Sequence, residues 1–265
     1  MEVSNIKPGH PIWADLSTTD LEASKKFYGE LFGWTFEGSA DEYGNYTTAF
    51  KNGKQVAAMM PYSVEMGGVP NIWTVYLATE NSEDTAAKVA AAGGTVTVPP
   101  MNVDPYGWMG IYQSPGGEFV GSWQPNTHHG FELLAEPGTF AWFEAMTKDY
   151  DAARSFYEGA FGWNIDVMSD TDEFRYATLG GGAEAAAGLM DASTFLEDHI
   201  PGFWQVYINV DNVDESVAKL QELGGQLLEP AADTDFGRIA FVTDSTGSRF
   251  RLQQQLEFGA NFPIS

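Results

Sequence analysis

Two carboxylates attract attention because each follows a tryptophan by two positions within a segment that occurs twice. Asp15 follows Trp13, and Glu144 follows Trp142, 129 residues further along the chain. Residues i and i+2 of a strand share one face, so each indole points to the same side as its carboxylate. A carboxylate on an apolar face must be hydrogen-bonded, paired with a base, or held neutral with a raised pKa. Asp15 and Glu144 are therefore candidate general bases or ligand anchors.

Each of these four residues also has a purely structural interpretation. The indoles of Trp13 and Trp142 could stack on an aromatic or conjugated ligand, but large aromatic side chains are common in protein cores. Asp15 and Glu144 could instead be tied to neighbouring backbone amides, or to an arginine at a domain interface. The sequence leaves both interpretations open.

The segments around the two pairs are copies of each other. Residues 13–34 read WADLSTTDLEASKKFYGELFGW, and residues 142–163 read WFEAMTKDYDAARSFYEGAFGW, aligned without a gap. A short alternating run followed by apolar residues at helical spacing predicts a strand, a turn and a helix. Asp20 is placed to cap the first helix and Gly33 to end it. Alternate strand residues, including Trp13, then face away from that helix.

The remaining sequence predicts more strands and helices in the same order. Asn52-Gly53 is a strong hairpin signal within residues 46–61. Residues 73–96 and 204–227 match each other, and each reads as a strand, a capped helix and a Gly-Gly stop. The turn at Ser114–Gly117 has a counterpart at Asp244–Gly247. We therefore predict four related modules that together account for almost the whole chain.

A repeat of this kind divides the 265 residues nearly in half. We expect one domain over residues 1–126, a linker over residues 127–138 with Pro and Gly but no clear period, and a second domain over residues 139–265. His128 and His129 lie in this linker. We interpret them as exposed loop residues, with a two-histidine metal site as the less favoured alternative.

Composition excludes several classes of function. The net charge is −24, from 13 basic and 37 acidic residues, and such a surface repels nucleic acid and anionic membranes. The acidic residues are scattered, which favours a solubilising role. There is no cysteine, so disulfides and thiolate chemistry are ruled out. The N-terminus has no signal-peptide pattern, so we expect a cytoplasmic protein. Phosphate-binding and hydrolase motifs are also absent from the sequence.

The repeated strand–helix–strand–strand–strand (βαβββ) module, with its DLEAS…FY…LFGW segment, resembles the vicinal-oxygen-chelate superfamily. That group includes glyoxalase I, extradiol dioxygenases, fosfomycin-resistance enzymes and bleomycin-resistance proteins. The two-domain layout, with a Trp at the head of both first strands, is similar to glyoxalase-like proteins labelled as hydroxylases. The resemblance covers nearly the whole chain. It implies an α+β fold of tandem βαβββ modules, in which each domain curls a mixed or antiparallel sheet into a cup with helices outside.

In the metalloenzymes of that superfamily, a His opens the first strand of a module and a Glu or His lies near the end of its last strand. Counting from the turns places these positions at residues that lack both imidazole and carboxylate groups: Trp13, Thr74, Gly121, Trp142, Gln205 and Arg251. A divalent ion needs two or more such donors converging on it. The resemblance therefore implies cups without a metal, and we expect no cofactor.

The same comparison suggests which residues contact a ligand. Beside Trp13 and Trp142, Thr74 and Gln205 occupy the opening strands of the other two modules, and Arg251 is placed to pair with Glu144. Residues on strands expected to approach the cup mouths are Tyr106, Trp108, Tyr112, Phe236, Arg238 and Phe241. Surface aromatics at a domain or dimer interface would give the same pattern.

We favour a metal-independent small-molecule binding protein with one aromatic-lined cavity per domain. The first alternative is an enzyme, a lyase, isomerase or hydroxylase-like protein, that uses Asp15, Glu144 or a metal. The second is an interaction or antigen-type protein whose cups have closed. The expected partner is a small organic ligand, aromatic in the favoured hypothesis, and either a monomer or a homodimer is compatible with four modules.

Overall fold

The computed structural model describes residues 1–3, 5–38, 44–64 and 69–255. Its helices begin and end where short-range signals place them. Asp20 caps α1 (Leu21–Phe32) by accepting a hydrogen bond from the Ala23 amide at 2.9 Å, and Gly33 ends it with a φ of 72°. The other helices have equivalent side-chain caps, which are Asn81 for α2 (Ser82–Ala91), Asp149 for α3 (Tyr150–Phe161) and Asn212 for α4 (Val213–Glu222).

Within the described residues, the strands form two eight-stranded mixed sheets, each built from two modules. The order in the first sheet is β2-β3-β4-β1-β5-β8-β7-β6. Its strands are β1 (Pro11–Thr18), β2 (Thr35–Gly38), β3 (Thr47–Lys51), β4 (Lys54–Pro61), β5 (Ile72–Ala78), β6 (Thr95–Val103), β7 (Gly107–Gln113) and β8 (Phe119–Pro125). The predicted α+β fold of tandem modules is confirmed.

The second sheet repeats this order as β10-β11-β12-β9-β13-β16-β15-β14. Its strands are β9 (Phe140–Thr147), β10 (Ile165–Asp170), β11 (Arg175–Leu179), β12 (Gly188–Asp191), β13 (Phe203–Asn209), β14 (Gln226–Thr234), β15 (Gly237–Thr243) and β16 (Arg249–Gln254). In both sheets the first strand of one module pairs antiparallel with the first strand of the next. The centre of each sheet is therefore the seam between two modules.

The predicted turns are found between strands. Asn52 and Gly53 have φ angles of 54° and 74° and join β3 to β4, as a tight hairpin requires. The glycine-rich run that begins at Gly180 joins β11 to β12 and includes a short 3-10 helix, Gly182–Glu184. The run of glycines is therefore a turn between two strands.

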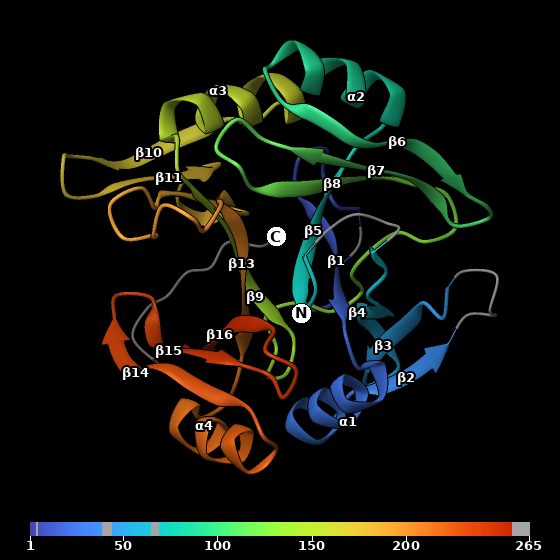
Figure 1. Ribbon diagram of the computed structural model, residues 1–265, viewed down its shortest axis with the longest axis vertical. Helices are drawn as coiled ribbons and strands as arrows, with labels where there is room; N and C mark the ends of the chain where they lie inside the picture. Colours follow the sequence, from blue (N-terminus) through green and yellow to red (C-terminus); the bar gives the residue numbers. More distant parts are fainter. Residues whose placement is uncertain (4, 39–43, 65–68, 256–265) are drawn as a thin grey trace.

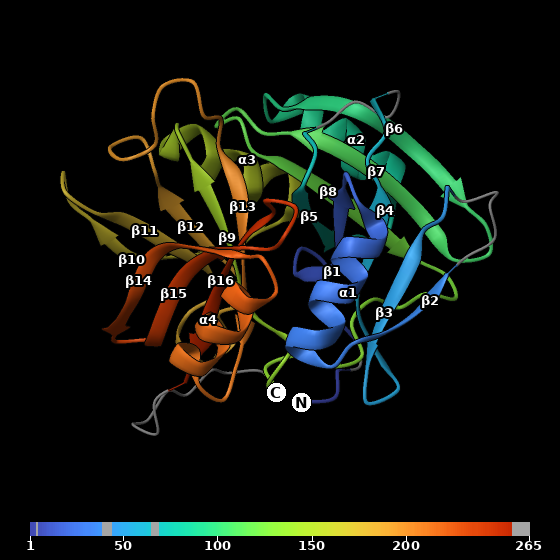
Figure 2. The same cartoon turned by 60° about the horizontal axis from the view of Figure 1, so that its bottom comes forward.

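The two sheets pack together through their helix-covered faces (Figures 1 and 2). α1 lies beside α4, and α2 lies beside α3. The Tyr28 ring of α1 lies 5.8 Å from Phe250 of β16, and Trp73 of β5 lies 5.4 Å from Phe140 of β9. Residues of both halves therefore share one continuous core. The concave faces of the sheets point away from it, toward the left and right of Figure 1.

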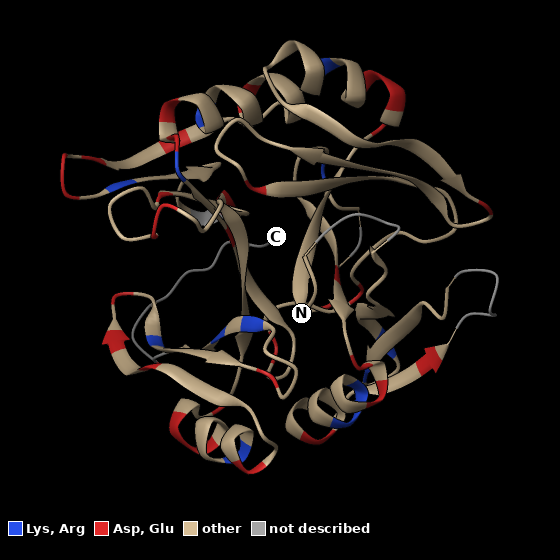
Figure 3. Ribbon diagram, in the orientation of Figure 1, with Lys and Arg blue, Asp and Glu red and all other residues tan. Residues whose placement is uncertain are grey.

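Charged residues are found on the helices, turns and many strands, whereas the strands β5, β6, β7, β8 and β13 carry none (Figure 3). Acidic segments are spread over both halves of the molecule, as the sequence predicted, and do not form a single cluster. Among the described residues, no helix has the length and apolar character needed to cross a bilayer.

Candidate functional site

The floor of the first cup contains a chain of hydrogen bonds that ends at Asp15. The indole Nε1 of Trp13 donates to the Tyr46 hydroxyl at 2.8 Å, and that hydroxyl donates to Asp15 Oδ2 at 3.2 Å. Strand pairing sets Tyr76 of β5 opposite Trp13, and Thr74 opposite Asp15. The floor is thus made by an indole, two phenols and one carboxyl group.

Asp15 is almost completely inaccessible to solvent, with 2% of its surface exposed. Burial raises its pKa to about 7, and hydrogen bonding with Tyr76 and Tyr46 offsets only part of this shift. The Oδ1 atom accepts no hydrogen bond from the residues that the structure describes. Near neutral pH this carboxyl group can therefore exist in either protonation state, and it has hydrogen-bonding capacity left for a ligand.

The second cup repeats the same arrangement with one longer side chain. Trp142 Nε1 donates to the Tyr176 hydroxyl at 3.2 Å, and the Tyr207 hydroxyl donates to Glu144 Oε2 at 2.8 Å. Burial raises the pKa of Glu144, while hydrogen bonds from Tyr207 and Tyr176 and the charge of Arg251 lower it in part. Both cups therefore contain a Trp, two Tyr and a buried carboxyl group.

Glycines make room for the aromatic side chains. A Cβ at Gly121 of β8 would lie 2.2 Å from the ring of Tyr76, and a Cβ at Gly188 of β12 would lie 2.3 Å from the Tyr176 hydroxyl. Such distances are far below ordinary contact, so any larger residue would displace the ring. Gly121 thus allows the phenol of Tyr76 to lie flat against the sheet.

The second cup has two further polar side chains with unmet hydrogen-bonding capacity. Gln205 is paired in register with Glu144, it is 1% exposed, and its Oε1 has no partner among the described residues. Arg251 is paired with Tyr207, and its buried Nε likewise has no partner in the described part of the chain. Unpaired buried polar atoms are unfavourable unless something else satisfies them.

The fold and its two cups agree with the protein family that the sequence matches. The family model described as "Glyoxalase/Bleomycin resistance protein/Dioxygenase superfamily" matches residues 10–120 and again residues 139–252. The chain belongs to this superfamily. "Putative glyoxylase CFP32" of Mycobacterium tuberculosis (strain CDC 1551 / Oshkosh) is 36% identical over 251 residues, which cover 93% of this chain and 95% of the relative. "Anthracycline biosynthesis protein DnrV" of Streptomyces peucetius is 32% identical over 271 residues and covers 96% of both chains.

Solved structures of the superfamily share the fold at low sequence identity. The Mn(II)-bound glyoxalase from Novosphingobium aromaticivorans has a TM-score of 0.66 at 16% identity and covers 95% of this chain and 83% of its own. The 2,3-dioxygenase LapB from Pseudomonas sp. KL28 has a TM-score of 0.64 at 13% identity, and the match covers 97% of this chain and 96% of the dioxygenase chain. These two likenesses establish the architecture.

A divalent metal, as in the Mn(II)-bound glyoxalase, does not fit the residues of these two cup floors. Each floor supplies one carboxyl group, and its neighbours across the strands are Tyr76 and Thr74 in the first cup. The described residues contain no cluster of three His, Asp or Glu side chains able to hold an ion. One carboxylate without imidazole partners is a poor site for a divalent ion.

Three residues that were expected near the cup mouths, Trp108, Tyr112 and Arg238, lie on the helix-covered faces of the sheets. Tyr112 was expected near a cup mouth, but it is fully buried on the helix-covered face, where its hydroxyl pairs with Ser122 at 2.9 Å and its ring lies 6.3 Å from Phe161 of α3. Trp108 shares that face because it lies four residues earlier on β7, and Tyr106 lies in the preceding turn.

Arg238 also lies away from Glu144. Its guanidinium group pairs with Asp214 of α4 at 3.0 Å and with Asp233 at 2.9 Å, which places it on the helix-covered side of β15. The structure does bring together Glu144, Gln205 and Arg251 in the second cup, through the pairing of β9, β13 and β16. The arginine pairs with Glu229 at 3.5 Å, and the Glu144 carboxylate receives its hydrogen bond from a tyrosine.

Two residues of the predicted linker, His128 and Phe131, pack against Trp13 in the first cup. His128 was expected to be exposed, but it is half-buried with its ring 4.4 Å from Trp13, and Phe131 contacts the same indole at 5.4 Å. Burial lowers the pKa of His128 to about 4, so it is neutral at neutral pH. Trp13 is consequently 3% exposed, whereas Trp142 remains partly accessible. The second cup is therefore the more open of the two.

Sequence reasoning missed the four tyrosines that complete the cup floors. Tyr46, just before β3, and Tyr176, near the start of β11, lie 130 residues apart, and Tyr76 and Tyr207 occupy matching places in VYL and VYI, 131 residues apart. The repeat would have revealed both pairs, but a strand register was needed to place them beside Asp15. The comparison of the two halves carries more information about the site than the family pattern does.

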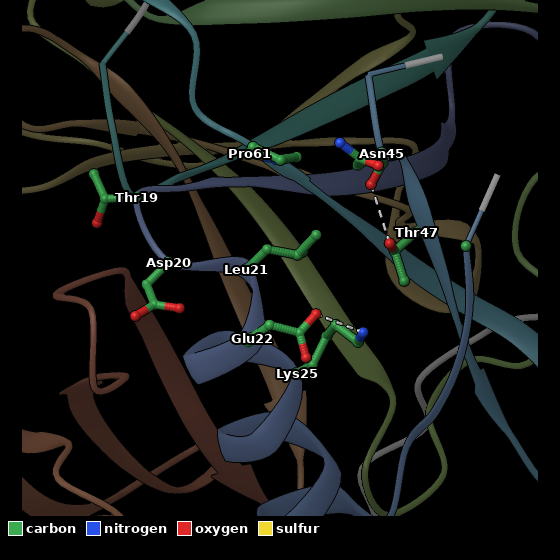
Figure 4. A pocket seen from close by; sticks show the side chains of 9 residues that line it. Thr19, Asp20, Leu21, Glu22, Lys25, Asn45, Thr47 and Pro61 are labelled. Atoms are coloured by element: carbon green, nitrogen blue, oxygen red, sulfur yellow. Dashed lines mark hydrogen bonds and ion pairs between the residues drawn. The ribbon is translucent and has the colours of Figure 1, made fainter. Parts of the chain in front are cut away.

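A separate hollow of about 560 Å³ lies at the start of α1, and Figure 4 shows Thr19, Asp20, Asn45 and Pro61 around it. Its one basic side chain, Lys25, pairs with Glu22 at 2.8 Å within the same helix. The hollow opens beside the helix-covered face of the first sheet and is separate from the cup that contains Asp15.

Proposed function

We propose that this chain is a metal-independent small-molecule binding protein whose cups hold a flat, conjugated ligand. The observation that carries the proposal is the repeated floor of indole, tyrosine and buried carboxyl group, with Asp15 Oδ1 in one cup and Gln205 Oε1 in the other left without partners among the described residues. An unsatisfied buried polar atom costs about 1–3 kcal/mol. A ligand hydroxyl group that donates a hydrogen bond to either oxygen would recover that free energy.

The chemical character of the walls supports an aromatic ligand. Trp142 and Tyr176 are partly accessible, and the Tyr176 ring is stacked on the exposed Phe174 ring with centroids 5.8 Å apart. Offset stacking on such surfaces favours planar molecules. The relative from Streptomyces peucetius is named for anthracycline biosynthesis, and a polycyclic aromatic compound of that kind is consistent with these walls.

The test is the binding of 1,4-dihydroxyanthraquinone, measured by isothermal titration calorimetry in buffer containing EDTA. We expect saturable binding, which Trp142→Ala weakens at least about tenfold because the stacking surface is removed. Trp108→Ala is the matched control, since that indole is exposed and on the opposite face, and it should bind normally. Binding that appears only after a divalent cation is added would contradict the proposal.

A second candidate function is proton transfer, as in a lyase or isomerase. It is favoured by one observation, that burial raises the pKa of Asp15 to about 7, where a general base or acid works well. If a substrate of this protein is found, Asp15→Asn and Glu144→Gln should each reduce turnover at least about a hundredfold. Turnover that survives both substitutions would eliminate this candidate.

A further inference from the structure

The two cups differ in charge at one matched position. Gly121 of β8 stands opposite Tyr76 in the first cup, and Arg251 of β16 stands opposite Tyr207 in the second. The first cup thus has a glycine where the second has a cation. Both floors contain a Trp, two Tyr and a carboxyl group, so this difference in charge separates the ligands that the two cups can accept.

The guanidinium group of Arg251 is held in place but incompletely neutralised. Its central carbon lies 4.8 Å from the centre of the Phe241 ring and 5.9 Å from that of Tyr207. It contacts Glu229 through Nη1 at 3.5 Å, but that carboxylate is largely in solvent, where such a pair is weak. Its Nε is buried and has no partner among the described residues. A fixed guanidinium edge of this kind suits a carboxylate or another planar anion.

A hydrogen-bond acceptor lies nearby on the same floor. Gln205 precedes Tyr207 by two residues on β13, so both side chains lie on the cup face, and Gln205 stands beside Glu144 on the neighbouring strand. Its amide nitrogen donates to the Val206 carbonyl at 3.1 Å, which leaves Oε1 buried and unpartnered in the described chain. Positions diagonal across paired strands are about 7–8 Å apart, which a two-ring molecule can span.

We propose that the second cup selects an aromatic ligand bearing an anionic oxygen, with the anion held by Arg251 and a ligand hydroxyl donated to Gln205. This inference rests on the proposed function and adds the ligand class and the cup that binds it. The first cup disfavours the same ligand because it has Gly121 at the position that Arg251 occupies in the second cup. Each chain therefore binds one such anion.

The test compares 6-hydroxy-2-naphthoate, whose hydroxyl and carboxylate lie on opposite rings, with its neutral amide, 6-hydroxy-2-naphthamide, by calorimetry at pH 7.5 in EDTA. The wild-type chain should bind one equivalent of the naphthoate at least about tenfold more tightly than the amide. Arg251→Gln should bring the two affinities within about threefold of each other, and Arg251→Lys should keep part of the preference. Arg238→Gln, which alters an arginine paired with Asp214 on the other face, should change neither affinity.

A second comparison isolates the acceptor. Gln205→Leu should weaken the binding of 6-hydroxy-2-naphthoate but not that of 2-naphthoate, because the latter lacks the donated hydroxyl. Thermal unfolding of each variant verifies that it is folded. Equal binding of naphthoate and amide by the wild type, or an unchanged preference in Arg251→Gln, would overturn this inference and leave the proposed function standing. Failure of both compounds to bind would overturn the two together.

Discussion

At the scale of single residues, the protonation of the carboxyl group in each cup depends on how deeply that group is buried. Asp15 and Glu144 are both nearly inaccessible, and in both cases removal from water is the largest cause of the raised pKa. The tyrosines that contact them stabilise the charged forms only in part. Asp15, whose pKa is raised to about 7, can therefore donate or accept a hydrogen bond near neutral pH.

Asp15→Asn tests this account through the pH dependence of stability. The folded-state pKa lies above the unfolded value of 3.8, so the folded chain holds this proton more tightly, and the stability it provides is lost as the pH rises through 7. Asparagine cannot ionise. We expect the free energy of unfolding of the variant, relative to wild type, to increase by about 2–3 kcal/mol from pH 5 to pH 8.

Urea unfolding at pH 5, 6, 7 and 8 measures this difference. Asp172→Asn, at an exposed turn residue, is the matched control and should follow the wild-type curve. A constant difference between Asp15→Asn and wild type across that range would mean that Asp15 ionises normally despite its burial.

At the level of elements, the close packing of strands around Tyr76 makes Gly121 essential to the first cup. A Cβ there would lie 2.2 Å from one carbon of the ring and 2.6 Å from another. The ring of Tyr76, which belongs to β5, lies against Gly121 of β8 and near Asp15 of the neighbouring strand β1. A methyl group on β8 must therefore move the phenol, and with it part of the carboxyl environment.

Gly121→Ala should lower the free energy of unfolding by about 1–3 kcal/mol, the usual cost of overpacking. Gly38→Ala is the matched control, because the nearest atom to a Cβ there is 3.9 Å away, and it should be neutral or slightly stabilising. Guanidinium unfolding followed by tryptophan fluorescence measures both. Equal stability of the two variants would show that Tyr76 does not lie against β8.

Elements whose signals are local were predictable from the sequence, and residues whose position depends on sheet register were not. The cap at Asp20, the stop at Gly33 and the Asn52-Gly53 hairpin depend on neighbours in sequence. Tyr112 was expected near a cup mouth but lies on the helix-covered face, because the face that a strand residue occupies depends on the sheet register. Tyr76 and Tyr207 lie on β5 and β13, whose pairing with β1 and β9 joins residues far apart in sequence. Tyr46 and Tyr176 reach the floor from beside β3 and from β11, one strand further away in each sheet.

At the scale of the whole molecule, each half donates a hydrogen bond to the other half. The donor is an indole, and the acceptor is a backbone carbonyl just before the first strand of the other half. Trp34, just after α1, donates from Nε1 to the Gly138 carbonyl at 2.7 Å, and Trp163, just after α3, donates to the Gly9 carbonyl at 2.9 Å. The two bonds are related by the internal repeat.

A further buried contact joins the halves where Glu118, in the turn before β8, lies near Tyr157 of α3. Burial raises the pKa of Glu118. The halves should therefore unfold together.

Trp163→Phe tests this coupling between the halves. The variant keeps an aromatic ring in the core but removes the buried N–H donor, so the Gly9 carbonyl loses its partner and stability should fall by about 1–3 kcal/mol. Differential scanning calorimetry should still show one transition, at a lower temperature, because the continuous core spans both sheets. Trp108→Phe, at an exposed indole, should leave the transition unchanged. Two separated transitions in the wild type or in Trp163→Phe would show that the halves fold independently, because a shared core cannot come apart in two steps.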